Sequence, residues 1–160
     1  MRVIGSIFRV RRDLTALIKK HVLPGFKLTL EETDLLLDLY GAAKLGWDDP
    51  VAIKDGYVAF SVVKAALVHS AAALSRRVAA LRAAGLLETR MLHEILPAKE
   101  KVNRKSVVLR ISPEGEKIIQ PVYDRYAKLC EAMLKDVSED DRLDFLKFNE
   151  RLMGKARWGV

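Results

Sequence analysis

The chain of 160 residues has a single cysteine, Cys130, so it cannot form an internal disulfide. This scarcity indicates a protein of a reducing compartment rather than a disulfide-stabilised secreted domain. Long apolar runs are also missing, because no stretch approaches the length of a transmembrane helix. Near the N-terminus, Arg9, Arg11 and Arg12 interrupt the apolar core that a signal peptide requires. These absences predict a soluble, cytoplasmic protein with no membrane partner.

Motifs for catalysis and metal binding are also missing. The three histidines are isolated from one another and from the cysteine, so no spacing is typical of a metal site. The sequence has no glycine-rich phosphate loop, no nucleophile elbow and no Ser/His/Asp grouping. Cys130 falls on the apolar side of a predicted helix, which favours a buried structural thiol over a redox switch. We therefore expect neither an enzyme nor a cofactor.

Acidic residues are outnumbered, with 21 Asp and Glu against 28 Lys and Arg, which gives a net charge of +7. Two basic blocks lie in the middle of the chain, where residues 64–90 and 99–110 each carry five basic side chains and one acidic side chain. Such an excess favours an anionic partner, either a nucleic acid or an acidic membrane surface. The charge alone does not choose between them.

Capping signals and hydrophobic periodicity predict the order of the elements. Thr29 followed by Glu32 makes a capping box, and Ser138 opens the last helix in a similar way. Ser70 is a typical N-cap, and Gly85 is a typical left-handed residue after a helix. The predicted helices are residues 3–22, a helix after Thr29, residues 60–68, a helix between Ser70 and Gly85, residues 113–136 and a helix after Ser138. Strands are predicted at 87–91 and 107–111 with a short strand near 57–59, and loops at 46–56 and 92–105.

Apolar stripes at helical spacing predict the buried faces of these helices. The stripes are Ile4, Ile7, Leu14 and Ile18; Leu35, Leu36 and Leu39; Val63, Ala66 and Leu67; Leu74, Val78 and Leu81; Ile118, Ile119, Val122, Tyr126, Leu129 and Met133; and Leu143, Leu146 and Met153. Half of the residues are hydrophobic, which suffices for the core of one domain.

The helix between Ser70 and Gly85 has an unusual outward face. A solvated helix face normally carries Glu and Lys in pairs four residues apart. Here the face opposite Leu74 is small and cationic, and consists of Ala72, Ser75, Arg76, Ala79 and Ala83. Small side chains allow a close approach to another surface. The bland alternative is an alanine-rich packing helix whose arginines are merely solvated.

The order of short helix, tight turn, second helix and two-stranded hairpin is that of a helix-turn-helix with a wing. In that arrangement the outward face would enter a major groove, where Ser75 and Arg76 could donate to base edges. Ser70 lies at the helix N-terminus, where free N–H groups favour a phosphate. The basic hairpin could reach an adjacent minor groove. The pattern therefore favours double-stranded DNA as the partner.

The run "SAAALSRRVAALRAAGLLE", followed by the basic hairpin and "LRISPEGEKI", resembles the winged helix-turn-helix regulators of the MarR (multiple antibiotic resistance regulator) family. That family's LxxxGLV pattern is matched by Leu81, Gly85, Leu86 and Leu87. Its LTPEG pattern is matched by Ile111, Ser112, Pro113, Glu114 and Gly115. The resemblance spans residues 29–153.

The resemblance implies a mainly α fold with a small β-hairpin wing, over residues 1–160 as a single domain. Residues 1–27 and 112–153 would be dimerisation helices, residues 29–111 the DNA-binding lobe, and residues 154–160 a tail. It also implies a homodimeric transcriptional regulator. Such regulators are most often repressors, relieved by a small phenolic or lipophilic ligand or by thiol oxidation.

The resemblance further implies which residues contact DNA. Ser70, Ala72, Ser75 and Arg76 match the groove-facing positions, and Arg77, nearer the flank of the helix, is a phosphate-binding or structural residue. The family's wing carries Asp-x-Arg, but this chain has Asn103, Arg104 and Lys105 at those positions, in a longer wing. The candidate wing contacts are Lys99, Lys101, Arg104 and Lys105. Two alternatives stay open: a protein-interaction module that binds an acidic partner through the same face, and a membrane-associated basic protein.

Overall fold

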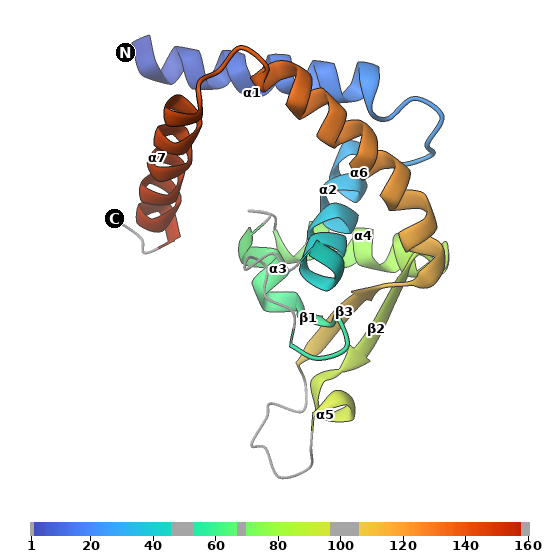
Figure 1. The fold of residues 1–160 in the computed structure, drawn as a ribbon. Coiled ribbons are helices and arrows are strands. Elements are labelled where there is room, and N and C mark those ends of the chain that lie inside the picture. Colours follow the sequence, from blue (N-terminus) through green and yellow to red (C-terminus); the bar gives the residue numbers. More distant parts are fainter. Residues whose placement is uncertain (1, 46–52, 67–69, 97–105, 158–160) are drawn as a thin grey trace. The chain divides into compact units, whose positions relative to one another are not determined.

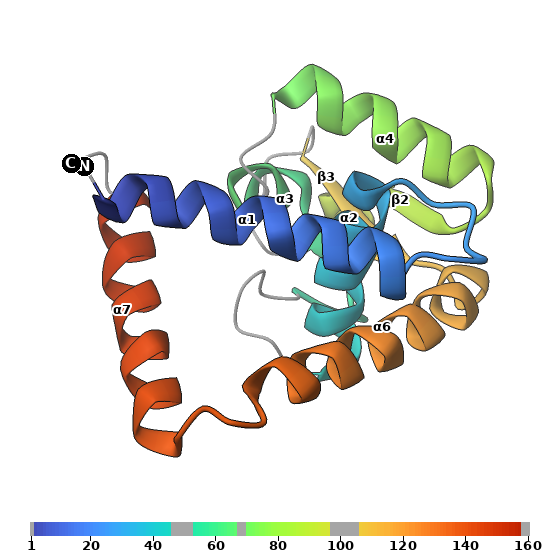
Figure 2. The ribbon, with the colours of Figure 1, turned by 90° about the horizontal axis from the view of Figure 1, so that it is seen from above.

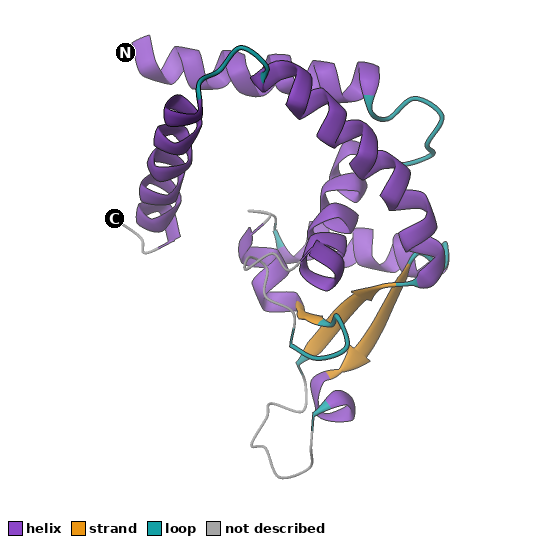
Figure 3. Cartoon of the chain, viewed as in Figure 1, coloured by secondary structure: helices purple, strands orange, loops and turns teal. Residues whose placement is uncertain are grey.

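The computed structural model describes residues 2–45, 53–66, 70–96 and 106–157, and the chain forms two compact units. The first unit is Met1–Tyr126 and the second is Ala127–Val160. Helix α6 (Pro113–Leu134) contributes to both units, and helix α7 (Glu139–Arg157) belongs to the second. Figure 1 traces the order of the elements and Figure 3 separates helices from strands.

The first unit is largely helical and contains one small sheet. Its remaining elements are α1 (Arg2–His21), α2 (Leu30–Tyr40), the π-helical turn η1 (Gly41–Leu45), β1 (Val58–Ala59), α3 (Phe60–Ala66), α4 (Ala71–Ala83), β2 (Leu87–Met91), α5 (Leu92–Ile95) and β3 (Val107–Ile111). The predicted helices and strands are therefore confirmed within the described residues. The π-helical turn that continues α2 was not predicted.

The predicted caps are present. The Thr29 hydroxyl accepts a hydrogen bond from the amide of Glu32 at 3.2 Å, and the Glu32 carboxylate accepts one from the Thr29 amide at 2.8 Å. At the start of α7, the Ser138 hydroxyl accepts from the amide of Asp141 at 3.2 Å. These bonds satisfy amide groups that have no partner inside the helix, which fixes where each helix begins.

The sheet has three antiparallel strands in the order β1-β3-β2. In its register Leu87 lies opposite Ile111, and Val58 lies opposite Leu109. A two-residue turn of Asp55 and Gly56 precedes β1, with φ of 52° and 75°. Positive φ at both positions is what a type I′ turn requires, and Asp-Gly is a preferred pair for it. The predicted hairpin of β2 and β3 is thus confirmed, and the predicted short strand β1 joins it to make the three-stranded sheet that we call the wing.

Most of the predicted apolar stripes of the first unit form its core. Among the described residues the buried side chains include Ile18, Leu35, Leu36, Leu39, Val63, Leu74, Val78, Leu81, Ile119 and Val122, together with Val108, Leu109 and Ile111 of β3. Helices α2 and α3 pack on β3, and helices α4 and α5 pack on β2. The core thus holds α4 by one side only.

One predicted loop is wrong in part. The segment after β2 continues as the single helical turn α5 instead of entering the hairpin loop directly. Ile95 is buried against Tyr57 and Val108, and Leu92 and Leu96 pack on the same cluster. The Glu94 carboxylate also accepts a hydrogen bond from the Met91 amide at 3.1 Å. Burial of Leu92, Ile95 and Leu96 therefore favours a helical turn where the sequence pattern predicted a polar loop.

The second unit contradicts a different prediction. Leu143, Leu146 and Met133, expected to be buried, are 46%, 57% and 48% exposed in the chain by itself. Phe145 and Phe148 of α7 are also exposed. The second unit consists of the end of α6 and α7, so it offers no further layer to cover these side chains. The residues were correctly identified as an apolar stripe, but the prediction that this stripe is buried within the chain was wrong.

Cys130 is half-buried, and this burial raises the pKa of its thiol. No helix in the described parts of the chain is both long and apolar enough to cross a membrane. The same described residues contain no group of three or more His, Cys, Asp or Glu side chains that could hold a metal ion.

Candidate nucleic-acid interface

Helix α4 has one buried side and one exposed side. Leu74, Val78 and Leu81 point into the core, as their spacing predicted. On the opposite side Ala72, Ser75, Arg76, Ala79 and Ala83 are all exposed. In Figure 2, α4 runs along the outer edge of the first unit. The small cationic face is thus available to a partner, which excludes an α4 buried on all sides in the core of the first unit.

The start of α4 is set by Ser70. Its hydroxyl accepts a hydrogen bond from the amide of Ala73 at 3.2 Å, as expected of an N-cap. Ser70 is exposed, and its own O–H remains a potential donor. Because helix N-termini carry free amides and a partial positive charge, this end of α4 suits an anionic group such as phosphate.

The end of α4 is set by Gly85, which has a φ of +73°. The Gly85 amide donates to the Arg82 carbonyl at 3.0 Å, and the Leu86 amide donates to the Leu81 carbonyl at 2.9 Å. This pair of bonds is a Schellman motif, which requires a left-handed residue and so favours glycine. The predicted left-handed position is confirmed, and the chain turns from it directly into β2.

A groove of about 590 Å³ lies between α4 and β2. Its polar lining consists of Ser75 and Arg82 from α4, Thr89 and Arg90 from β2 and the carboxylate of Glu94 from α5. The remaining lining is apolar: Phe60, Val78, Ala79, Met91 and Val107. The Arg82 guanidinium donates to the Thr89 hydroxyl at 3.2 Å, so a side chain of α4 is bonded directly to the wing. Hydroxyl and guanidinium groups along this groove are donors of the kind that bind phosphate oxygens.

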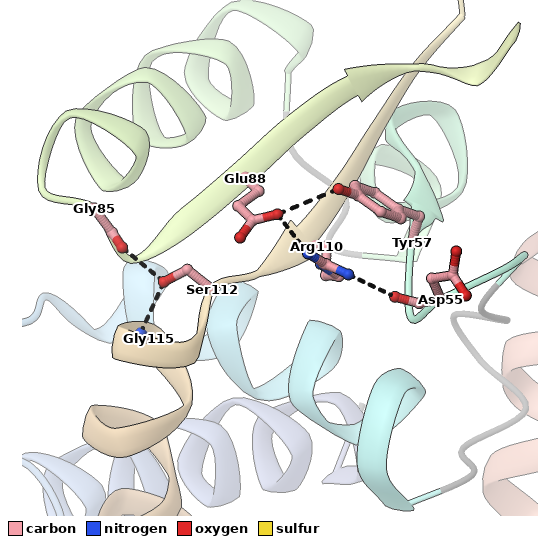
Figure 4. Close-up of polar contacts among 7 residues, drawn as sticks. All are labelled: Asp55, Tyr57, Gly85, Glu88, Arg110, Ser112 and Gly115. Carbon is pink, nitrogen blue, oxygen red and sulfur yellow. Dashed lines mark hydrogen bonds and ion pairs between the residues drawn. The ribbon is translucent and has the colours of Figure 1, made fainter. Parts of the chain in front are cut away.

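A partly buried polar network joins β2 and β3 to the residues just before β1 (Figure 4). The hydroxyl of Tyr57 donates to Glu88 Oε2 at 3.2 Å, and Arg110 Nη2 donates to the same oxygen at 2.7 Å. Arg110 also donates to the backbone carbonyl of Asp55 at 3.3 Å. Burial raises the pKa of Tyr57, whose side chain is enclosed by the sheet, while Arg110 and Arg90 oppose that rise. The network fixes the base of the wing beside α4.

This network was not among the predicted functional residues. The signal was available in part, because the register places Glu88 directly opposite Arg110, and opposite charges across neighbouring strands attract. The contribution of Tyr57 could not be predicted, because it depends on β1 pairing with β3.

The remaining predicted site residues divide into two groups. Arg77 is only partly exposed, and its Nη1 is buried with no hydrogen-bond partner among the described residues. It therefore lies at the flank of α4, as predicted, and not on the outward face. Lys99, Lys101, Arg104 and Lys105, with Asn103, fall outside the described residues.

Two helices joined through a short connection, followed by antiparallel strands that pack on the second helix, define a winged helix-turn-helix. Comparison with solved structures narrows this to the fold of the MarR-family regulators. AbsC, a MarR family transcriptional regulator from Streptomyces coelicolor, matches with a TM-score of 0.71 and 16% identity, over 99% of this chain and 93% of its own.

Two further structures have the same fold. S. aureus MepR in its DNA-binding conformation gives a TM-score of 0.73 at 12% identity, over 96% of this chain and 98% of its own. Bordetella bronchiseptica BpsR gives 0.64 at 15% identity, over 94% of this chain and 98% of its own. A scan against protein-family sequence models finds no match, and neither does a search of curated protein sequences. At these identities the structural similarity establishes the fold alone.

Proposed function

We propose that this protein is a sequence-specific, double-stranded DNA-binding regulator of transcription. The observation that carries the proposal is the exposed face of α4, which is small, carries Ser75 and Arg76, and lies beside a wing in a helix-turn-helix. A face without large side chains lets the helix backbone approach the bases, and the serine and arginine supply donors at base edges. Ser70 would bind a phosphate through its O–H and the helix N-terminus.

The wing would add contacts that do not depend on base identity. The groove between α4 and β2 would accept the sugar-phosphate strand that separates the two grooves of the duplex, with Arg82 and Thr89 as donors. Lys99, Lys101, Arg104 and Lys105 would supply positive charge at the adjacent minor groove. Arg77 would act from the flank of the helix, on phosphate or as a structural residue.

We further propose that the protein acts as a homodimer in the cytoplasm. The exposed apolar side chains of α7, together with Met133 and Leu134, support the homodimer, because solvent exposure of so many large apolar groups is unfavourable. A two-fold dimer would present two copies of α4 to half-sites about one helical turn apart. The operator would then be roughly palindromic.

Control of binding by a small effector is the remaining part of the proposal. BpsR, which has the same fold, has its DNA binding regulated by 6-hydroxynicotinic acid. By analogy, we propose repression that a small phenolic or lipophilic molecule relieves. A competing function is recognition of an acidic protein through the same basic face, and the experiment below distinguishes the two.

The test is selection of bound sites from a pool of random duplexes, followed by anisotropy titration of the selected and of unrelated duplexes. We expect a selected site with two-fold symmetry, and affinity for it that falls steeply with salt because neutralised phosphates release counterions. Weak binding without any sequence preference would contradict the proposal and favour the acidic protein partner.

A further inference from the structure

The end of helix α4 and the beginning of helix α6 share one hydroxyl group (Figure 4). Ser112 Oγ donates to the carbonyl of Gly85, the residue that ends α4, at 2.6 Å. The same oxygen accepts a hydrogen bond from the amide of Gly115, in the first turn of α6, at 3.0 Å. Ser112 is buried, so water does not readily replace either bond.

The backbone reinforces this connection. The Ser112 amide donates to the Leu86 carbonyl at 3.1 Å. A Cβ atom built on Gly115 would lie 2.1 Å from that carbonyl oxygen and 2.8 Å from Ile111 Cγ1. Real Cβ atoms do not approach a backbone oxygen so closely. The Leu86 carbonyl belongs to the backbone, so it cannot move aside without a large cost in free energy. Only glycine therefore allows the first turn of α6 to rest on the end of α4.

We propose that Ser112 and Gly115 are positioning residues for DNA recognition: they hold the C-terminal end of α4 against α6 and thereby set the angle at which Ser75 and Arg76 meet the bases. This inference rests on the proposed function. The core holds α4 along its buried side, and the Schellman motif fixes its last turn. Among the described residues, only Ser112 connects the end of α4 to the start of α6 through a side-chain hydrogen bond. A change in the first turn of α6 is therefore passed directly to the end of α4.

The proposed positioning role affects the overall affinity for DNA and the discrimination between DNA sequences to different degrees. Contacts to phosphate tolerate small displacements, because the charges act over several ångströms. Hydrogen bonds to base edges depend on both distance and angle. They are therefore lost when α4 shifts by only a fraction of a hydrogen-bond length. Removing the contacts of Ser112 or Gly115 should therefore reduce the affinity for the selected site more than the affinity for random DNA.

The variants are Ser112→Ala, which removes both hydroxyl bonds, Gly115→Ala, which introduces the close contact, and Ser112→Thr, which keeps the hydroxyl. The matched control is Thr29→Ala, which removes a helix N-cap of the same kind in α2. Among the described residues, the Thr29 hydroxyl bonds to Glu32 alone, within the first turn of the same helix. Thr29→Ala thus reports the loss of an N-cap without loosening α4.

The first measurement is amide hydrogen exchange of residues 81–89 in the DNA-free protein. We expect exchange about tenfold faster in Ser112→Ala than in Thr29→Ala, with the rate restored in Ser112→Thr. The second measurement is the ratio of the affinities for the selected and for random duplexes, at one salt concentration and well below the melting temperature. We expect about a tenfold fall in this ratio for Ser112→Ala and Gly115→Ala, and none for Thr29→Ala or Ser112→Thr.

The two measurements separate the possible failures. If the wild-type protein selects no site, the proposed function fails, and the exchange rates still decide whether Ser112 holds the end of α4. If the wild-type protein selects a site but Ser112→Ala keeps the wild-type ratio, the positioning role is overturned even where stability falls. Should Gly115→Ala not fold, Ser112→Ala and its threonine counterpart decide the matter alone.

Discussion

The guanidinium carbon of Arg110 lies 4.7 Å from the centre of the Tyr57 ring, while Nη2 of the same side chain bonds to Glu88. Arg110 thus makes both a cation–π contact and an ion pair, in a partly enclosed site. Such a site is screened less by solvent than an exposed pair. This combination joins β2 and β3 to Tyr57, the residue that precedes β1, at the base of the wing.

The first prediction concerns stability. Arg110→Ala removes the ion pair and the contact with Tyr57, so we expect the free energy of unfolding to fall by about 1–3 kcal/mol. Urea unfolding followed by circular dichroism measures this. Arg12→Ala is the control, because its pair with Asp13 is largely exposed and should contribute less than about 1 kcal/mol. Equal losses in the two variants would show that the network adds nothing beyond a surface pair.

The second prediction concerns assembly. Leu146→Asp places a charge in the apolar surface of α7, so we expect the dimer dissociation constant to rise by about tenfold or more. Sedimentation equilibrium measures it. Lys147→Ala, on a neighbouring side chain that pairs with Asp144, is the control and should leave the constant nearly unchanged. A wild-type protein that stays monomeric at every concentration would refute the homodimer.

The third prediction concerns pH. Burial, and then the charge of Asp34, raise the pKa of Asp38 from 3.8 to about 6. The folded protein therefore holds this proton more tightly than the unfolded chain does. The resulting stabilisation is complete below pH 3.8 and is lost as the pH rises through 6, where the partly buried carboxylate ionises.

Asp38→Asn keeps the shape of this side chain but cannot ionise. At about pH 7.5 we expect it to raise the free energy of unfolding by about 1–3 kcal/mol, and near pH 4 to change it little. Urea titrations at both pH values measure the difference, with the exposed Asp124→Asn as control. A gain of the same size at both pH values would assign the effect to something other than ionisation.

Much of the fold could be predicted because the local signals and the packing agree. Ser70, Gly85 and the Leu74 stripe defined α4 with the correct caps and the correct buried side. The helical turn at Leu92 could not be predicted, since it depends on a cluster with Tyr57, distant in the sequence. The exposure of Leu146 in the chain by itself could not be predicted either, because periodicity identifies an apolar face and not what covers it.

The candidate site was predictable to the same degree. The outward residues of α4 follow from helical geometry, so Ser75 and Arg76 were placed correctly on an exposed face. The proposed role of Ser112 could not be predicted from the sequence, because it depends on the carbonyl of Gly85, distant in the chain, to which the Ser112 hydroxyl donates. Contacts between elements far apart in the chain are what the sequence alone left out.

The last prediction separates base recognition from charge. Arg76 is exposed on the outward face of α4, so Arg76→Ala should lose about 1–3 kcal/mol of binding free energy on the selected site and tolerate base changes at one position of each half-site. Lys147→Ala, which removes the same charge from α7, is the control and should bind both duplexes as the wild type does. Anisotropy titrations at two salt concentrations measure these effects. Equal losses for Arg76→Ala on the selected and random duplexes, with a shallower salt dependence, would assign Arg76 to a phosphate contact and leave base recognition to Ser75 and the wing.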